Sequence, residues 1–448
     1  MPIMLDVGSG PAVSDQMIST FQQKIDELNT FPLHRFRVSS ASQDIDTEPV
    51  ILVKLIADAN QGSPRSNLLP YARVLEVYHA ALKNSLEQSS LDSLADYVAH
   101  QVLDLFAEER ATLSRLIPKA ADSAISPELV ERIDRRSMRS FKYAPTYHLT
   151  FSLFSGASTP SAWDIKAALD EYLTPLLQSF SSISTFTVDT QVQLYASLPP
   201  SMRGPVYDSE SAQWTLEKAD LSGFVNAAEW PLSPSIGLGP TINFILYAPS
   251  EGKSPLVIKE TGGNSWLIPQ WGGIQILNLP AGSTSNSSLL KQDLAPVMHT
   301  FADQLVSLLG LPQSPPSLPL RISSLKRERA ASLILSASDT LGALSRLSLK
   351  LEAIAIPNNV AASVEKTIAH LEQACRELHD GRFQKALQHA RIAEGEAEQA
   401  FFDPSMVGQV YFPDEHKVAV YVPLLGPMAV PLLMALIKEV KKLRRPNA

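Results

Sequence analysis

An uncharged segment near the C-terminus constrains the fold of this chain more than any other feature. Val418 to Ile437, VAVYVPLLGPMAVPLLMALI, is a run of 20 residues without a formal charge. As a helix it would be ~30 Å long, about the thickness of one hydrocarbon core. The segment predicts a transmembrane helix over 418–437, with a buried core helix as the alternative. Its three prolines favour the membrane, where neighbouring helices can satisfy the backbone groups that proline leaves free.

The charges after this segment indicate its orientation. Residues 438–448 hold five basic residues and one acidic residue, in a chain whose net charge is −8. Because positively charged flanks stay on the cytoplasmic side, we expect a basic cytosolic tail over 438–448. The bulk of the chain then lies across the membrane, which in a eukaryotic cell means the lumen of the endoplasmic reticulum. The acidic balance of that bulk argues against nucleic-acid binding.

The N-terminal residues leave the route into the lumen open. MPIMLDVGSGPAVSD has neither the basic region nor the apolar core of a signal peptide. Either the protein is tail-anchored with its bulk in the cytosol, or an N-terminal membrane anchor is missing from this sequence. The basic tail favours the second explanation, since tail anchoring would carry five positive charges across the membrane. Asn286 begins an Asn-Ser-Ser acceptor in a polar loop and is a predicted glycosylation site.

The prolines of the apolar segment suggest a second role for it. Pro423, Pro427 and Pro431 are spaced four apart, and Gly426 lies among them. Steps of four residues advance about 400° around a helix, so the three prolines lie near one face. Small residues beside them let another backbone approach closely. We expect this face to pack against partner helices, with a simple kinked anchor as the alternative.

The rest of the chain predicts a mixed α/β sheet with packed helices, in two parts of one lumenal domain, 1–146 and 147–310. The first part predicts a helix at 14–29, strands at 36–40 and 49–58, and helices at 71–88 and 91–117. In the second part a strand, a helical crossover and further strands follow one another, which is typical of an α/β layer. The stretch FTVDTQVQLYAS alternates with period two, so we expect it to expose one face.

A helical region is predicted over 321–402. The proline-rich LPQSPPSLPL precedes it, and helical periodicity continues to about Phe402. Ile356-Pro357 and Asp380-Gly381 interrupt the pattern, so two or three helices should pack as a hairpin.

Cys375 and His379 form the strongest candidate for catalysis. They are four residues apart and so share one face of a predicted helix. A nucleophilic cysteine needs a lowered pKa and an oriented base, usually at a strand end or a helix N-terminus. A cysteine within a helix such as AHLEQACRELHD is more often a small core residue. We therefore expect a structural role, and a cysteine-dependent enzyme using Cys375 is the alternative.

Other chemical motifs are missing from the sequence. It contains no GxxxxGK or GxGxxG phosphate loop, no GxSxG elbow, no HExxH motif and no Cys/His zinc spacing. We expect no catalytic residue, cofactor or metal ion. The pairs Gly262-Gly263 and Gly272-Gly273 flank Trp266 and Trp271, which could line a groove. Turns between strands, with the tryptophans as core or interface anchors, are the favoured interpretation.

Three stretches in this order resemble the PIG-S family, which contributes a subunit to the glycosylphosphatidylinositol (GPI) transamidase of the endoplasmic reticulum. The similarity runs from about Tyr147 to the C-terminus, roughly two thirds of the chain. The first stretch contains YHLTFSLF, WDIKAALDEYLTPLL and FTVDTQVQLYA, and the second contains INFILYAP, SPLVI and PQWGGIQILN. The third is AFFDPSMVGQVYFPDEHKVAVYVPLLGPMAVPLLMALIK.

The resemblance implies a non-catalytic subunit of the complex that cleaves a C-terminal signal from a precursor and joins the new C-terminus to a GPI lipid. The nucleophile then belongs to another, caspase-like subunit. The implied partners are the other transamidase subunits and the endoplasmic reticulum membrane. Family members are expected to have a transmembrane helix near each end, and this chain departs from that pattern by lacking the first. A tail-anchored cytosolic adaptor is the alternative.

Overall fold

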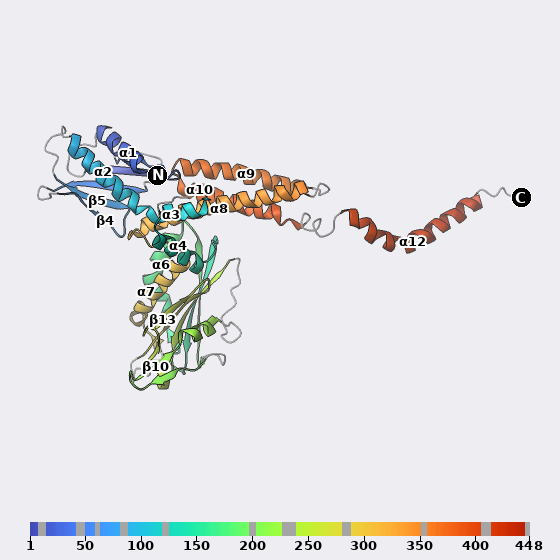
Figure 1. Ribbon diagram of the computed structural model, residues 1–448. Coiled ribbons are helices and arrows are strands. Elements are labelled where there is room, and N and C mark those ends of the chain that lie inside the picture. Colours follow the sequence, from blue (N-terminus) through green and yellow to red (C-terminus); the bar gives the residue numbers. More distant parts are fainter. Residues whose placement is uncertain are drawn as a thin grey trace. The chain divides into compact units, whose positions relative to one another are not determined.

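The chain forms two compact units, residues 1–329 and residues 330–448. The computed structural model describes residues 1–7, 15–41, 50–58, 63–80, 88–118, 125–196, 203–225, 239–279, 288–350, 356–404 and 414–443. Sheets with packed helices occupy the first unit, and the described part of the second is helical (Figure 1). The expected combination of mixed α/β sheets and a helical C-terminal region is therefore confirmed.

The first five-stranded sheet has the strand order β2-β1-β3-β5-β4. Its strands are parallel except β4, which pairs antiparallel with β5. Helices α1 and α2 lie side by side, and Phe21 and Ile25 of α1 are buried. The elements of this part are β1 (Pro2–Val7), α1 (Asp15–Leu28), β2 (Arg37–Ser40), β3 (Ile51–Ala57), β4 (Arg65–Leu68), β5 (Val74–His79), α2 (Gln88–Leu105) and α3 (Ala107–Leu116).

One expected helix in this part is wrong. Residues 74–79, within the helix expected over 71–88, form strand β5, which pairs with β3 on one side and β4 on the other. The side chains of VLEVYH alternate between partly exposed and buried, which is a strand period. The helix expected over 91–117 is present, but it is interrupted at Phe106 and divides into α2 and α3.

The second five-stranded sheet has the order β13-β14-β11-β6-β8, and only β13 is antiparallel to its neighbour. Nine of the ten residues of β6 are buried, whereas none of the nine residues of the edge strand β8 is. The expectation of one exposed face for this stretch is wrong, because both faces of this edge strand carry exposed residues. The sheet comprises β6 (Thr146–Ser155), β8 (Thr185–Gln193), β11 (Thr241–Ala248), β13 (Ser265–Ile268) and β14 (Gly272–Ile276).

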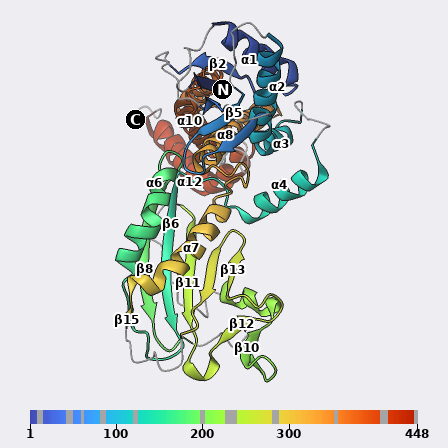
Figure 2. The same cartoon turned by 90° about the vertical axis from the view of Figure 1, so that its left-hand side faces the viewer.

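Helices cover one face of the second sheet. Helix α7 crosses this face (Figure 2), and its Phe301 packs against Phe151 of β6 and Phe244 of β11. The rings of Phe151 and Phe244 stack with centroids 5.1 Å apart. The helical elements here are α4 (Pro127–Arg139), α5 (Ile165–Ala168), the π-helical turn η2 (Leu169–Leu173), α6 (Thr174–Phe180) and α7 (Lys291–Leu308).

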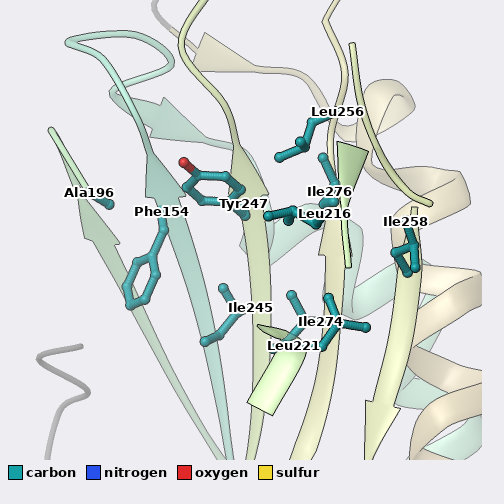
Figure 3. Packing of buried hydrophobic residues seen from close by; sticks show 10 residues of the cluster. All are labelled: Phe154, Ala196, Leu216, Leu221, Ile245, Tyr247, Leu256, Ile258, Ile274 and Ile276. Carbon is teal, nitrogen blue, oxygen red and sulfur yellow. The ribbon is translucent and has the colours of Figure 1, made fainter. Parts of the chain in front are cut away.

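The opposite face carries a second apolar cluster and small accessory strands. Ile245, Tyr247, Ile274 and Ile276 of the main sheet pack there with Leu216 and Leu256 of a three-stranded sheet (Figure 3). The three-stranded sheet comprises β9 (Val206–Asp208), β10 (Gln213–Leu216) and β12 (Leu256–Ile258), and the short helical turns are η3 (Lys218–Val225) and η4 (Glu251–Lys253). Strands β7 (Ala162–Trp163) and β15 (Ser288–Leu289) form a separate two-stranded sheet, directly before α5 and α7 in the chain.

The helical unit is built from the C-terminal part of α8 (Leu318–Lys350) with α9 (Asn358–His379) and α10 (Phe383–Phe401). Alanines let these helices approach closely: Ala337, Ala393 and Ala397 form one buried cluster. The expected break at Asp380-Gly381 is present. Gly381 adopts φ +79°, and the amides of Gly381 and Arg382 donate to the carbonyls of Leu378 and Glu377, which is a Schellman motif.

Candidate functional site

The structure does not join Cys375 and His379 into a catalytic pair. The thiol of Cys375 is exposed on α9 and makes no hydrogen bond with any residue that the structure describes. The Nδ1 atom of His379 lies 3.1 Å from Oδ1 of Asp380, so its ring is directed to the helix end. The expected burial of Cys375 as a small core residue is wrong, because the α9 face that packs on α10 does not include this position. Nothing in this arrangement activates a thiol.

The two tryptophans are core anchors, as favoured from the sequence. Trp266 and Trp271 are partly buried and pack against the apolar cluster shown in Figure 3. Only one glycine pair lies in a turn, where Gly262 has φ +63°. Gly272 and Gly273 instead begin strand β14. Glycine is required at both positions, because any side chain there would collide with its neighbours. These glycines serve strand packing and do not line a binding groove.

A buried ionic network lies within the first unit. Arg327 of α8 makes a two-pronged contact with Glu109 of α3, at 2.7 Å from Nε to Oε1 and 2.5 Å from Nη2 to Oε2. The same guanidinium donates to the hydroxyl groups of Ser323 and Ser324. His34 lies 3.6 Å from Glu109 on the other side. The side chains of Arg327 and Glu109 are only 4% and 1% exposed, so this pair is fully removed from water.

A second arginine extends the network to α4. Arg136 donates to Glu108 of α3 at 3.1 Å and to Glu328 of α8 at 2.9 Å. Glu108 also accepts the backbone amides of Gln313 and Ser314, the latter at 2.8 Å. The network therefore ties together α3, α4, the start of α8 and the chain just before it.

The pKa values of Glu109 and Glu328 shift in opposite directions, although burial raises both. Burial alone would raise the pKa of Glu109, but the charge and hydrogen bonds of Arg327, with His34, hold it well below its usual range. For Glu328, burial raises the pKa to about 7, against the attraction of Arg136. The charges of Glu109 and Glu108 contribute to this increase, and one oxygen of Glu328 is buried without a hydrogen-bond partner. Three carboxylates share two directly bound guanidinium groups, and Glu328 is the least compensated of them.

The arrangement of these groups indicates a structural role. Perturbed carboxyl groups often mark active sites, but here each binds another member of the network or the backbone. The predictions from the sequence did not include this network. The sequence signal for it was the pair of adjacent acidic residues Glu108-Glu109 inside the otherwise periodic helix FAEERATLSRL. Among the described residues, no group of three or more His, Cys, Asp or Glu side chains is placed to hold a metal ion.

The apolar C-terminal segment lies within one long helix, α12 (Asp414–Leu443), which contains Pro423, Pro427 and Pro431. The side chains of these prolines are exposed, and a Cβ built on Gly426 would have open space around it. Within the described part of the chain, however, no helix combines the length and the apolarity that crossing a membrane requires. Helix formation is therefore confirmed, whereas the transmembrane assignment is not. Asn286 lies outside the described residues.

Comparison with known proteins places the chain in one family. The model of the family described as "PIG-S: Phosphatidylinositol-glycan biosynthesis class S protein" matches residues 1–446. The human protein named "GPI-anchor transamidase component PIGS" is 34% identical over 325 residues, which cover 67% of this chain and 58% of that protein. The Schizosaccharomyces pombe "GPI transamidase component PIG-S homolog" is 31% identical over 371 residues, 77% of this chain and 65% of the relative.

A third relative, with a lower sequence identity, is also named as a GPI transamidase component. The Saccharomyces cerevisiae "GPI transamidase component GPI17" is 29% identical over 325 residues, 68% of this chain and 59% of its own length. The chain thus spans somewhat less than two thirds of each of these relatives. The family match extends over nearly all of its residues, including those before Tyr147, where the resemblance seen in the sequence began. The chain belongs to the PIG-S family.

Proposed function

We propose that this chain is a non-catalytic subunit of a GPI transamidase complex, supporting the attachment of GPI anchors to the C-termini of precursor proteins. One observation carries the proposal: relatives from human and two yeasts, matched over two thirds or more of the chain, are each named as a component of that enzyme. The geometry around Cys375 supports an accessory role. Its thiol is exposed, and the nearest histidine of the same helix face, His379, contacts Asp380 instead. The chemical step is therefore proposed to belong to another subunit, which the family resemblance implies is caspase-like.

Cells that lack the protein provide the test. We expect them to accumulate uncleaved precursors and unused GPI lipid, and we expect re-expression of the full-length protein to restore anchoring. Cys375→Ala should restore it as well as the unaltered chain, since no reaction depends on the thiol. Normal surface levels of GPI-anchored proteins in the deficient cells would refute the proposal. Restoration by the unaltered chain but not by Cys375→Ala would instead favour a cysteine-dependent enzyme.

We further propose that Val418–Ile437 anchors the protein in the endoplasmic reticulum membrane, with the tail cytosolic and the bulk lumenal. The uncharged run and its basic flank support this orientation. Leu425, Met428, Leu432 and Leu436 of α12 are each more than half exposed. So much exposed apolar surface on one element marks contact with a membrane or with partner chains. In this topology Asn286 faces the lumen and carries a glycan.

The face of α12 around Pro423, Pro427 and Pro431 is proposed to bind partner helices. The open space around Gly426 lets a second backbone approach, and protein neighbours would satisfy the carbonyls that the prolines free. Replacing 418–437 by an unrelated apolar span of equal length, with the KEVKKLRR flank kept, tests this. We expect insertion without recovery of the complex. If the replaced chain still co-purifies with the transamidase and restores anchoring, the segment is only an anchor.

A further inference from the structure

Strand β8 is an unusually long open edge. It follows β6 at one side of the second sheet (Figure 2) and comprises nine residues, whereas β2, β4 and β13, the other edges of the two main sheets, comprise four each. Short edge strands are a common protection against pairing with other chains. Of the four edges, β8 is the one without this protection.

The residues of β8 do not supply the other usual protections either. Its sequence, TFTVDTQVQ, has no lysine and no proline, and β-branched residues predominate. Asp189, at its centre, is the single charged residue. The strand therefore combines high strand propensity with an edge that another polypeptide can extend.

The backbone groups that face this open side can be identified. The amide of Thr185 donates to the carbonyl of Pro145, one residue before its register partner Thr146. In a parallel pair, every second residue bonds to the same neighbour, so the odd-numbered residues of β8 turn their backbone to β6. The N–H and C=O groups of Phe186, Val188, Thr190 and Val192 therefore point away from the sheet. No strand of the described residues lies there.

The side chains define what kind of strand would fit. Successive side chains of β8 alternate between faces, and one face carries Val188 and Val192, which are 40% and 39% exposed. The other face is polar and carries Asp189 between Thr187 and Gln191. A strand added beside β8 should therefore be amphipathic, with β-branched or aromatic residues on the valine side.

Charge decides between a second copy of this chain and a different partner. Asp189 is the middle residue of β8, so a full-length antiparallel pairing of two β8 strands would place two Asp189 carboxylates opposite each other. Like charges in that position destabilise a sheet. The carboxylate of Asp189 also forms no hydrogen bond or ion pair with another described residue, so its charge is available to a partner.

We propose that β8 receives an extended segment of another subunit of the complex as a sixth strand, with a lysine or arginine of that segment opposite Asp189. Main-chain hydrogen bonds would hold the segment, and the cation opposite Asp189 would fix its register. This inference relies on the proposed function only for the identity of the complex. It extends that function by assigning a contact surface.

Hydrogen exchange of the full chain, alone and in the purified complex, tests strand addition directly. The amides of Phe186, Val188, Thr190 and Val192 should exchange at least about tenfold more slowly in the complex, because each gains a partner carbonyl. Those of Thr187 and Asp189 already bond to β6 and serve as the internal reference. Equal exchange of the outward amides in both states would overturn the proposal.

Variants of β8 provide a second test, read as the amount of the other subunits that co-purifies with the tagged chain from deficient cells. Thr190→Pro removes an outward N–H that β6 does not use, so the isolated chain should still fold. Thr190→Val keeps that N–H and is the matched control. We expect about tenfold less co-purified partner for Thr190→Pro, as for an interface weakened by ~1.4 kcal/mol, and none of this loss for Thr190→Val.

A charge reversal keeps the test valid if the proline variant misfolds. Asp189→Arg should reduce co-purification about as strongly, because two cations would then face each other across the pair. Val206→Lys adds a positive charge on β9, at a side chain that is 66% exposed, and should leave assembly unchanged. Full assembly of both β8 variants, or a photo-crosslink from Val192 to a second copy of this chain, would overturn the proposal. If the unaltered chain recovers no transamidase subunit, the proposed function fails instead.

Discussion

At the level of single residues, the buried ion pairs make the stability of the first unit sensitive to substitution. Removing one partner of such a pair leaves an uncompensated charge in a site that water does not reach, which costs more than the pair contributes. Arg327 and Glu109 are the clearest case, because both are almost completely buried and bind each other through two hydrogen bonds.

Arg327→Met should destabilise the first unit by about 3 to 5 kcal/mol, because Glu109 would remain buried without its cation. Urea unfolding followed by tryptophan fluorescence measures the loss. Arg203→Met, which removes an arginine that is 81% exposed beside Glu217, is the control and should change little. The double variant Arg327→Met/Glu109→Gln should recover part of the loss. Wild-type stability of the single variant would contradict this account.

Glu328 predicts a dependence of stability on pH. Burial raises its pKa from 4.5 in the unfolded chain to about 7 in the fold. Between these values the folded state binds more protons, so the free energy of unfolding falls as pH rises from 4.5 to 7, by up to ~3 kcal/mol. Glu109 has a lowered pKa and acts in the opposite sense, with stability lost as pH falls below 4.5.

In Glu328→Gln the free energy of unfolding should therefore vary less between pH 4.5 and 7. The loss of stability below pH 4.5, which depends on Glu109, should remain. The measurement is the urea midpoint of each protein over a pH series. Glu131→Gln, at a carboxylate that is 69% exposed, is the matched control and should keep the wild-type slope. An unchanged slope in Glu328→Gln would show that Glu328 is not the titrating group.

At the level of elements, the second sheet depends on a glycine at the start of β14. Gly272 pairs with Asn243 of β11, and a Cβ at Gly272 would lie 1.9 Å from the Asn243 carbonyl oxygen. That atom belongs to the backbone, so the contact can be relieved only by moving one strand away from the other. The absence of a side chain thus sets the spacing between two central strands.

Gly272→Ala should destabilise the protein by about 2 to 3 kcal/mol, because the added methyl group separates β14 from β11. Gly252→Ala is the control, since Gly252 has no atom within 4 Å of an added Cβ. Thermal unfolding of both variants beside the unaltered chain gives the comparison. Equal midpoints for the two variants would show that strand spacing does not depend on Gly272.

For the whole molecule, the proposed topology predicts which parts of the chain a protease added outside the membrane can reach. In sealed microsomes a tag after Ala448 should be digested, while the region around Asn286 should be protected. With a lumenal bulk, Asn286→Gln should also remove glycosidase-sensitive mass from the full-length protein. Protection of the C-terminal tag would contradict the orientation. An unchanged gel position of Asn286→Gln would contradict the glycan.

Local features of the sequence determined the parts of the fold that depend on neighbouring residues. Periodicity indicated α1, α9 and α10, and Gly381 marked the turn between the last two, because a Schellman motif needs a residue at positive φ. The ordered stretches from Tyr147 onward indicated the family by themselves, and the family match extends over residues 1–446. Each of these features can be recognised without knowing which distant segments of the chain meet.

Only the tertiary structure decided the features that depend on distant contacts. Residues 74–79 form a strand because β3 and β4 supply partners on both sides, which overrides the helical interpretation. The exposure of β8 follows from its place at the edge of a sheet, which its alternating sequence does not encode. Glu109 and Arg327 are 218 residues apart, so their burial as a pair arises only when α3 and α8 pack together. Sequence periodicity reports which side of an element is apolar, but it does not report which charged groups the fold brings together.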